Sequence, residues 1–472
     1  MKQKQYITCA IPYVNARPHQ GHALEFIQGD TIARYHRILG EDVILLSGAD
    51  ANALKNVQAA QAAGIDVQTF VDQNAKLFQE LAKKLNVQFD IFQKGNDKKH
   101  HQSSQKLWEL CDKAGDIYKK SYKGLYCVGC EAFYTPDELD ESGECFEHPG
   151  KKLEEVEEVN YFFKLSKYQD QLTKLIEEDE YQIIPNSKKN EALSFIKSGL
   201  QDISISRTNE RAKNWGVAVP KDSTQKIYVW MDALNIYQSG VGFGWDEEQY
   251  KKWWPADLHV IGRGILRFHA VYWPAFLLSA GLPLPKKLFV HDYITVNGQK
   301  MSKTIGNIVD PLEVIKEYGV DALRYYLLSK VSPFADGDYS NRKMLETYNA
   351  DLANGLGNLV SRVAKLCEQN NIQAPKATTE FDPKMTVYLD EYKFNEALNH
   401  IWGEITLADR KVNEEKPWEL SGEKLKDVLE NLVKRIQHIG YNLQPFLPET
   451  SEKILKQFSG SIKSSAPLFP RI

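Results

Sequence analysis

The sequence lacks most features that would place it in a specialised class of proteins. It contains no run of about 18 apolar residues and no apolar core of a signal peptide, so it predicts neither a membrane-spanning helix nor secretion. It has no low-complexity tract and no obvious repeat. Lysine and arginine together number 59, aspartate and glutamate 63, and the net charge of −4 gives no global nucleic-acid signal. We therefore expect a cytoplasmic protein with no membrane partner.

Cysteine is also scarce, with six in 472 residues, which excludes a disulfide scaffold. Three of the six crowd together as Cys127, Cys130 and Cys145, and His148 completes the pattern CxxC–x14–CxxH. This is the spacing of two knuckle turns, and the ligand types suit tetrahedral zinc. The alternative is three buried thiols, although burial alone does not require paired spacings. We predict one structural zinc ion per chain, because four protein ligands leave no position open for water.

The chain is long enough for two to four domains. Its N-terminal part alternates apolar strands with helical patterns: strand 6–11, helix 23–39 and strand 42–47, then strands 227–230, 258–262 and 287–290. This order predicts a doubly wound parallel-sheet (Rossmann-like) α/β domain, interrupted by the zinc-binding insertion and followed by an α-helical bundle. The expected divisions are the first half of the sheet domain (1–115), the insertion (116–225), the second half (226–340) and the bundle (341–472).

Two stretches carry residues suited to phosphate chemistry. His19 and His22 flank Gly21 where the first strand gives way to a helix, and a helix start is a natural anion site. The alternative is that both are ordinary capping and surface histidines. Far along the chain, Lys300 and Lys303 follow a tight-turn signal at residues 297–298, which fits a loop that closes over a polyphosphate. Asp50 ends a buried strand, where it either faces a ligand ammonium or caps the next helix.

The segments PHQGH at 18–22 and KMSKT at 300–304 resemble the HIGH and KMSKS signatures of class I aminoacyl-tRNA synthetases. They stand about 280 residues apart, with the metal signature between them. The segments YVWMDA at 228–233 and ILRFH at 265–269 are similar to the methionyl-tRNA synthetase family in particular. The resemblance covers essentially the whole chain.

This resemblance implies ATP-dependent attachment of methionine to tRNA(Met) through a methionyl-adenylate, with ATP entering as its Mg²⁺ complex and AMP and pyrophosphate released. The implied catalytic residues are His19, His22, Lys300 and Lys303. The implied ATP-binding residues are these four together with Gly21, Gly262, Met301 and Ser302. The implied methionine pocket consists of Ala10, Ile11, Tyr13, Asp50, Trp230, Ala233, Leu234, Tyr237, Ile265 and His269. Asn358, Arg362 and Trp418 match the family's anticodon-reading residues, and a monomer is expected.

Several positions depart from the usual family pattern: Gln20 between the histidines, Ala51-Asn52 after Asp50, Gly264 and Asp292. With Gly264 in place of the usual acidic residue, the resemblance does not predict which residues contact the ATP ribose. With Ala51-Asn52, it does not predict the hydrogen bonds around the pocket. Two other functions therefore compete with the first. One is a class I synthetase for another amino acid, or a plain nucleotidyltransferase, although the latter would not need the helical C-terminal part. The other is a tRNA-binding relative with a weakened catalytic site.

Overall fold

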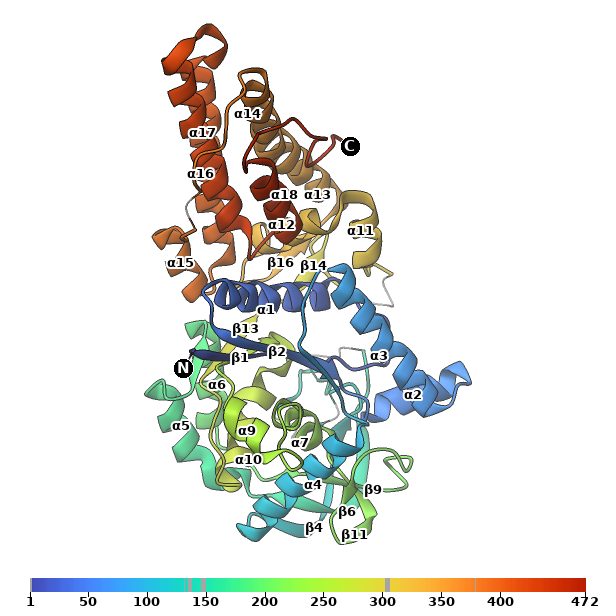
Figure 1. The fold of residues 1–472 in the computed structure, drawn as a ribbon. Helices are drawn as coiled ribbons and strands as arrows, with labels where there is room; N and C mark the ends of the chain where they lie inside the picture. Colours follow the sequence, from blue (N-terminus) through green and yellow to red (C-terminus); the bar gives the residue numbers. More distant parts are fainter. Residues whose placement is uncertain (1, 131, 135–137, 146–149, 302–305, 378) are drawn as a thin grey trace. The chain divides into compact units, whose positions relative to one another are not determined.

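The computed structural model describes residues 2–130, 132–134, 138–145, 150–301, 306–377 and 379–472 (Figure 1). The chain falls into two compact units. The first, which we call the sheet unit, comprises Met1–Pro18, Gly40–Glu80 and Gln88–His291. The second, the helical unit, comprises His19–Leu39, Leu81–Val87 and Asp292–Ile472. Within the described residues, no helix is both long and apolar enough to cross a membrane.

A six-stranded parallel sheet forms the centre of the sheet unit. Its order is β3 (Ile91–Lys94), β2 (Asp42–Ala49), β1 (Lys4–Cys9), β12 (Leu258–Gly262), β13 (Lys287–His291) and β7 (Gln182–Ile184). All neighbouring strands are parallel. From β1, the chain adds β2 and β3 on one side and β12 and β13 on the other, so the strand order reverses between β1 and β12. In such sheets, ligands bind beyond the carboxyl ends of the strands at the point of reversal. The predicted doubly wound α/β fold is confirmed.

Helices of the sheet unit pack around this sheet and share one apolar core with it. In Figure 1, α4, α7, α9 and α10 lie below the sheet. The helices of this part are α2 (Leu54–Ala63), α3 (Val67–Lys84), α4 (Lys98–Lys113), α7 (Val229–Leu234), α8 (Ile236–Ser239), α9 (Glu247–Trp253) and α10 (Trp273–Ser279).

Two elements of this unit differ from those expected. The strand predicted at 227–230 is wrong, because β11 (Asp222–Ile227) ends there and α7 begins at Val229. All six residues of α7 are buried, and a short, fully buried apolar run does not distinguish a helix from a strand. The apolar pattern after Gly262 predicts one continuous helix, but the structure has a 3₁₀ turn (Arg263–Ile265), a π-helical turn (Phe268–Tyr272) and α10 there. Such π turns are frequent at functional sites.

The segment between the two halves of the sheet forms small antiparallel sheets. One has the order β5 (Ala132–Tyr134), β4 (Ile117–Cys127), β6 (Glu154–Phe163) and β8 (Ile203–Ser204); the other joins β10 (Ala218–Val219), β11 and β9 (Ser206–Thr208). The helices here are α5 (Gln169–Glu177) and α6 (Asn186–Lys197). Between these two helices, β7 pairs with β13, so this segment also supplies an edge strand of the central sheet.

The helical unit contains α1 (Gln20–Ile38), a small sheet and most of the C-terminal helices. The sheet has the order β15 (Gln299–Lys300), β14 (Ile294–Val296) and β16 (Gly337–Tyr339). The helices are α11 (Pro311–Tyr318), α12 (Val320–Ser329), α13 (Asn341–Thr347), α14 (Asn358–Gln369), α15 (Pro383–Asp390), α16 (Phe394–Glu415), α17 (Gly422–Leu443) and α18 (Pro448–Gln457). The predicted helical C-terminal part is therefore confirmed.

Arg324 on α12 joins distant parts of the helical unit. Its fully buried guanidinium forms an ion pair of 2.9 Å with Asp30 on α1. It also donates to the carbonyls of Leu85 (3.2 Å) and Phe446 (2.7 Å). A buried guanidinium is stable only when its charge and its N–H groups are satisfied, so these bonds attach α1 to the turn before α18.

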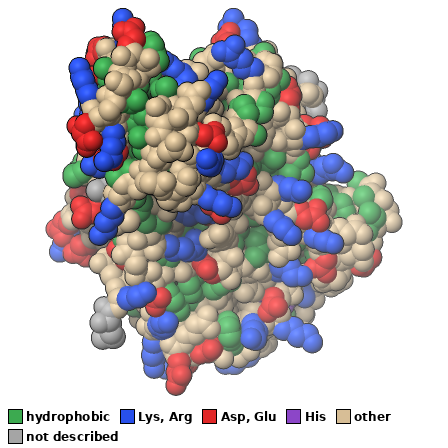
Figure 2. Space-filling view, turned by 45° about the horizontal axis from the view of Figure 1, so that its top comes forward, with side chains coloured by type: hydrophobic (Ala, Val, Ile, Leu, Met, Phe, Trp, Pro, Cys, Tyr) green, Lys and Arg blue, Asp and Glu red, His purple; other side chains and the backbone are tan. Residues whose placement is uncertain are grey.

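Charged side chains of both signs are interspersed on the face drawn in Figure 2, where lysine and arginine lie beside aspartate and glutamate. This agrees with the near balance of charge in the sequence. A nucleic-acid partner would therefore have to be recognised by particular side chains, because no single-sign field covers this face.

Candidate active site and metal centre

The start of α1 holds His19 and His22 close together. His19 is the N-cap: its Nδ1 accepts from the backbone N–H of Gly21 at 3.1 Å. The backbone N–H of His19 donates in turn to Nδ1 of His22 at 3.2 Å, and the two ring centroids are 4.0 Å apart. Because each Nδ1 acts as an acceptor, the proton of each neutral ring is on Nε2. The two imidazoles therefore carry N–H donors on the side away from the cap, as a phosphate site requires.

Gly21 and Gln20 lie between these histidines. A Cβ added to Gly21 would lie 3.0 Å from Cε1 of His19, so glycine leaves room for the capping ring. Gln20 is fully buried, and neither amide atom of its side chain has a hydrogen-bond partner within the described part of the chain. A buried amide without partners costs stability, on the order of 1–3 kcal/mol. Among the residues that the structure describes, no hydrogen bond compensates for this departure from the family pattern.

The predicted tight turn before the KMSKT segment is present. Asn297 and Gly298 both have positive φ, 52° and 77°, as a two-residue hairpin requires, and β14 pairs with β15 across them. Asp338 on β16 accepts from the Gly298 N–H at 2.7 Å and anchors the turn. Lys300 ends β15 and Met301 follows it, while Ser302 and Lys303 lie outside the described residues.

The residues predicted to bind methionine all belong to the sheet unit; six follow the carboxyl ends of central strands and four are on α7 and α8. Ala10, Ile11 and Tyr13 follow β1; Asp50 follows β2; Trp230, Ala233 and Leu234 are on α7; Tyr237 is on α8; Ile265 and His269 follow β12. The rings of Tyr13 and Trp230 meet edge to face, with centroids 6.2 Å apart. Trp230 and His269 meet at 6.5 Å, also edge to face. Aromatic residues far apart in sequence are thus brought to one place.

Hydrogen bonds fix the orientation of His269 and Tyr237. The Tyr237 hydroxyl lies 2.8 Å from Nε2 of His269, and Nδ1 of His269 lies 3.0 Å from the Ile265 carbonyl. A carbonyl can only accept, so Nδ1 carries the proton and Nε2 accepts from the tyrosine hydroxyl. Burial lowers the pKa of His269 to about 4, although the bond to the Ile265 carbonyl acts in the opposite direction. The ring is therefore neutral at pH 7.

This shift predicts a pH dependence of stability. The unfolded chain protonates this histidine near pH 6.5, the folded chain only near pH 4, so the contribution is complete above pH 6.5 and is lost as the pH falls from 6.5 to 4. From pH 7 to pH 5 it amounts to about 2 kcal/mol. His269→Gln keeps an acceptor and a donor without a titrating ring, so its urea midpoint should fall less over this range. His36→Gln is the control, and equal losses in wild type and His269→Gln would contradict the prediction.

The loop that follows β2 is held by hydrogen bonds to its backbone. Asp50 is 4% exposed; its N–H donates to the Pro12 carbonyl at 2.9 Å, and its carbonyl accepts from Asn56 Nδ2 at 2.8 Å. The Ala51 carbonyl accepts from Nε1 of Trp215 at 2.8 Å. These three hydrogen bonds hold the backbone of Asp50 and Ala51 in place.

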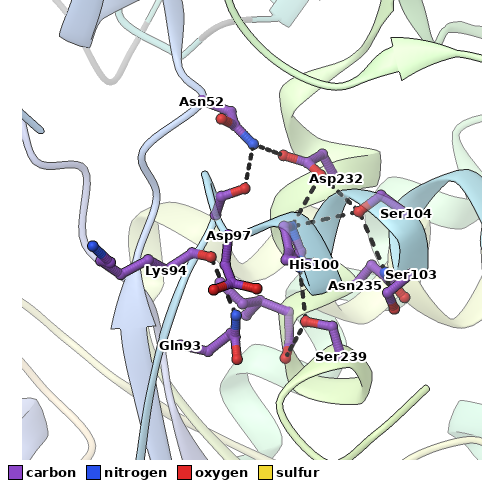
Figure 3. A network of polar contacts seen from close by, with 12 residues as sticks. Asn52, Gln93, Lys94, Asp97, His100, Ser103, Ser104, Asp232, Asn235 and Ser239 are labelled. Atoms are coloured by element: carbon purple, nitrogen blue, oxygen red, sulfur yellow. Dashed lines mark hydrogen bonds and ion pairs between the residues drawn. The ribbon is translucent and has the colours of Figure 1, made fainter. Parts of the chain in front are cut away.

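Asn52, the second departure in this loop, belongs to a buried polar network (Figure 3). Its Nδ2 donates to the Gly95 carbonyl and to Oδ2 of Asp232 on α7, both at 2.7 Å. Oδ1 of Asp232 also accepts from Ser104 Oγ at 2.7 Å and lies 2.9 Å from Nε2 of His100. Burial disfavours the charged carboxylate, but His100 and Asn52 outweigh it and lower the pKa of Asp232.

The three described cysteines of the metal pattern form a compact cluster. The sulfur of Cys145 lies 3.3 Å from that of Cys127 and 3.7 Å from that of Cys130, and all three lie within 4.8 Å of one another. Tetrahedral zinc with bonds of 2.3 Å separates its sulfur ligands by about 3.8 Å, so the cluster fits such an ion. The fourth predicted ligand, His148, lies outside the described residues.

The first cysteine turn also contacts the walls of the aromatic cluster. Trp230 Nε1 donates to the Cys130 carbonyl at 3.1 Å. Lys55 Nζ donates to the Gly129 carbonyl at 3.0 Å and lies 3.0 Å from the centre of the Tyr13 ring. The turn between Cys127 and Cys130 therefore contacts Trp230 directly and is linked to Tyr13 through Lys55.

The predicted anticodon-reading residues lie at one end of the helical bundle. Asn358 begins α14 and is exposed, and Arg362 lies one turn further along. Arg362 is hydrogen-bonded to Asp409 (2.9 Å) and Asn413 (2.8 Å), both on α16. Trp418 follows the end of α16 and is 55% exposed, so it is not a buried tryptophan that caps the bundle.

Comparisons with known proteins agree with this geometry. A family model described as tRNA synthetases class I (M) matches residues 5–364. The methionine--tRNA ligase of Thermotoga maritima is 42% identical over 98% of this chain and 76% of its own length; that of Brucella suis is 40% identical over 96% and 91%. The chain belongs to the methionyl-tRNA synthetase family. A Mycobacterium tuberculosis methionyl-tRNA synthetase in complex with methionyl-adenylate has a similar structure, with a TM-score of 0.91, 36% identity, and 99% and 100% of the two chains covered.

The predicted family, fold class and enzyme class, a methionine--tRNA ligase, are confirmed by these similarities. Three neighbours of the pocket were not predicted: Phe268, Lys55 and Asp232. Phe268 stacks on Trp230 with ring centroids 3.7 Å apart. Its place in the ILRFH segment gave the only signal for it, whereas no feature of the sequence singled out Lys55 or the partners of Asp232.

Proposed function

We propose that this chain attaches methionine to tRNA(Met) in two steps. The methionine carboxylate attacks the α-phosphorus of ATP, which forms methionyl-adenylate and releases pyrophosphate. A ribose hydroxyl of the 3′-terminal adenosine of the tRNA then takes the methionyl group, and AMP leaves. The observation that carries the proposal is the hydrogen-bonded ring cluster of Tyr13, Trp230, Tyr237 and His269 at the carboxyl ends of the central strands. The similar structure that holds methionyl-adenylate supports it.

The ring cluster suits a thioether side chain. A sulfur atom gains modestly from contact with aromatic edges, and an apolar pocket with few polar groups is typical of small-ligand sites. We assign methionine binding to Ala10, Ile11, Tyr13, Asp50, Trp230, Ala233, Leu234, Tyr237, Ile265 and His269. Asp50 is the acidic member of this set, and its carboxylate would pair with the substrate ammonium. A neutral His269 leaves Asp50 as the only charged group assigned to the pocket.

The phosphates of ATP are assigned to both signature segments. The Nε2–H groups of His19 and His22 and the ammonium groups of Lys300 and Lys303 would stabilise negative charge as it develops on the α-phosphate oxygens. Gly21, Gly262, Met301 and Ser302 complete the proposed ATP-binding set, and Mg²⁺ would arrive with the nucleotide. No protein nucleophile takes part, so positioning and electrostatic stabilisation supply the catalysis.

We assign anticodon recognition to Asn358, Arg362 and Trp418. An exposed tryptophan provides a stacking surface for an unpaired base, and an amide and a guanidinium can bind base edges. Asp409 and Asn413 hold the guanidinium of Arg362 in one orientation, which reduces the entropy lost when RNA binds. We further propose that the protein acts as a monomer in the cytoplasm.

A structural zinc ion is assigned to Cys127, Cys130, Cys145 and His148, where it would stabilise a segment with little core of its own. We expect about one zinc ion per chain by elemental analysis. Cys127→Ser should bind clearly less zinc, while Cys367→Ser, which changes a buried cysteine on α14, should keep the full content. Equal zinc in the two variants would contradict the assignment.

The function is tested by amino-acid-dependent exchange of pyrophosphate into ATP, measured with each of the twenty amino acids. Exchange with methionine alone, followed by charging of tRNA(Met), supports the proposal. Exchange with a different amino acid would establish a synthetase of other specificity. No exchange with any amino acid, in zinc-replete protein that still binds tRNA(Met), would favour the tRNA-binding relative and overturn the enzyme assignment.

A further inference from the structure

Asp232 is a carboxylate buried beside the predicted methionine pocket. It is 2% exposed, and its side chain contacts Asn52, His100 and Ser104 (Figure 3). A buried carboxylate is tolerated only where such partners compensate for the lost hydration. The contacts of Asp232 with Asn52, His100 and Ser104 therefore hold the surrounding segments together.

The partners of Asp232 come from separate parts of the sheet unit. Asp232 itself is on α7, between Trp230 and Leu234, and so shares its helix with three residues assigned to the methionine pocket. Asn52 stands two residues after Asp50, in the loop that follows β2. The Asn52–Asp232 hydrogen bond thus joins the segment that carries the charged group to the helix that carries the aromatic wall.

Both hydrogens of the Asn52 amide are engaged, one by Asp232 and one by the Gly95 carbonyl after β3. The C-terminal end of α7 and the following helix α8 are held as well. His100 on α4 lies 2.7 Å from Ser239 Oγ on α8, and Asn235, which links the two short helices, donates to Ser103 Oγ at 2.9 Å. Displacement of α7 relative to Asp50 would break several buried hydrogen bonds at once, and each buried group left unpaired is costly.

We propose that Asn52 and Asp232 are positioning residues that fix the separation between the Asp50 carboxylate and the pocket wall on α7. The inference rests on the proposed function, because it assumes that methionine lies between these two groups. It gives Asn52, a departure from the family pattern, a defined role. Loss of the bond should weaken methionine binding and leave ATP binding unchanged.

The test is a charge swap. Asn52→Asp replaces the hydrogen bond between Asn52 and Asp232 by two carboxylates that repel each other. The variant should have a KM for methionine about tenfold higher than wild type and a KM for ATP within about twofold of it. The double variant Asn52→Asp/Asp232→Asn restores a donor and an acceptor between these two side chains, although not the bond to the Gly95 carbonyl, and should therefore recover most of the loss, with KM for methionine within about threefold of wild type. Ser104→Ala removes a single bond to Asp232 and should shift KM in the same direction by less. It carries the test if Asn52→Asp fails to fold.

Ser206→Ala is the matched control, because it also removes hydrogen bonds of a buried serine, to Gln225 at 2.6 Å and from the Tyr161 N–H at 2.8 Å, but on β9 rather than beside the pocket. It should lower the melting temperature without changing KM for methionine. An unchanged KM for methionine in the folded Asn52 or Ser104 variants would overturn the inference. The inference would also be overturned if KM for methionine and KM for ATP both rose in Asn52→Asp and neither recovered in the double variant. Wild-type exchange with methionine is measured first, and its absence would instead refute the proposed function.

Discussion

Replacing His19 by serine should lower the rate of methionine-dependent pyrophosphate exchange about a hundredfold, or about 3 kcal/mol, by analogy with loss of one oxyanion donor. The substitution separates two roles of this residue. Nδ1 of His19 caps α1 by accepting from the Gly21 N–H, and a serine Oγ is an equally good cap acceptor. Serine cannot extend a second donor to where Nε2–H stands. The helix should therefore persist while the proposed phosphate contact is lost.

His19→Ala is the paired control, because it loses the cap as well as the donor. It should be as inactive as His19→Ser and also less stable, by about 1 kcal/mol. Thermal melting of the three proteins measures the second effect. If His19→Ser exchanged pyrophosphate at the wild-type rate, His19 would be only a capping residue, which is the alternative that the sequence left open.

The sequence predicted the central strands closely for a physical reason. β1, β2, β12 and β13 are largely buried, so each contains a mainly apolar run, and each was placed to within about three residues. The same logic failed at α7, whose residues are equally apolar and equally buried. Over only six residues, the spacing of apolar residues does not distinguish a buried helix from a buried strand.

The contacts that assemble the site could not be predicted from the sequence. The Asn52–Asp232 bond joins residues 180 positions apart, and β7 reaches the edge of the central sheet from within the segment predicted as an insertion. Such pairings depend on the register of the whole sheet rather than on any local pattern. The resemblance to a family supplied the pocket residues as a set, and the structure supplies the hydrogen bonds that orient them, such as Tyr237 to His269.

Asp50→Asn should lower kcat/KM for methionine more than a hundredfold, about 3 kcal/mol, because the substrate ammonium would be left in a buried site without its counter-charge. The loop should survive the change, since Pro12, Asn56 and Trp215 hold its backbone through hydrogen bonds that the substitution leaves in place. KM for ATP should stay at the wild-type value. A rise in both KM values would indicate a collapsed site instead.

Ligands that lack one charged group show whether Asp50 acts through the ammonium. Wild type should bind methionine far more tightly than 4-(methylthio)butanoate, which has no amino group, and Asp50→Asn should nearly abolish that preference, because the two changes remove partners of one ion pair. Methioninol keeps the ammonium and lacks the carboxylate, so the ratio of its affinity to that of methionine should be the same in both proteins. The ratios are obtained from KM for methionine and the inhibition constants of the two analogues in the exchange assay. A preference for methionine over the deaminated analogue that is undiminished in Asp50→Asn would place the ammonium against another group, and Asp50 would then be a buried cap of the loop before α2.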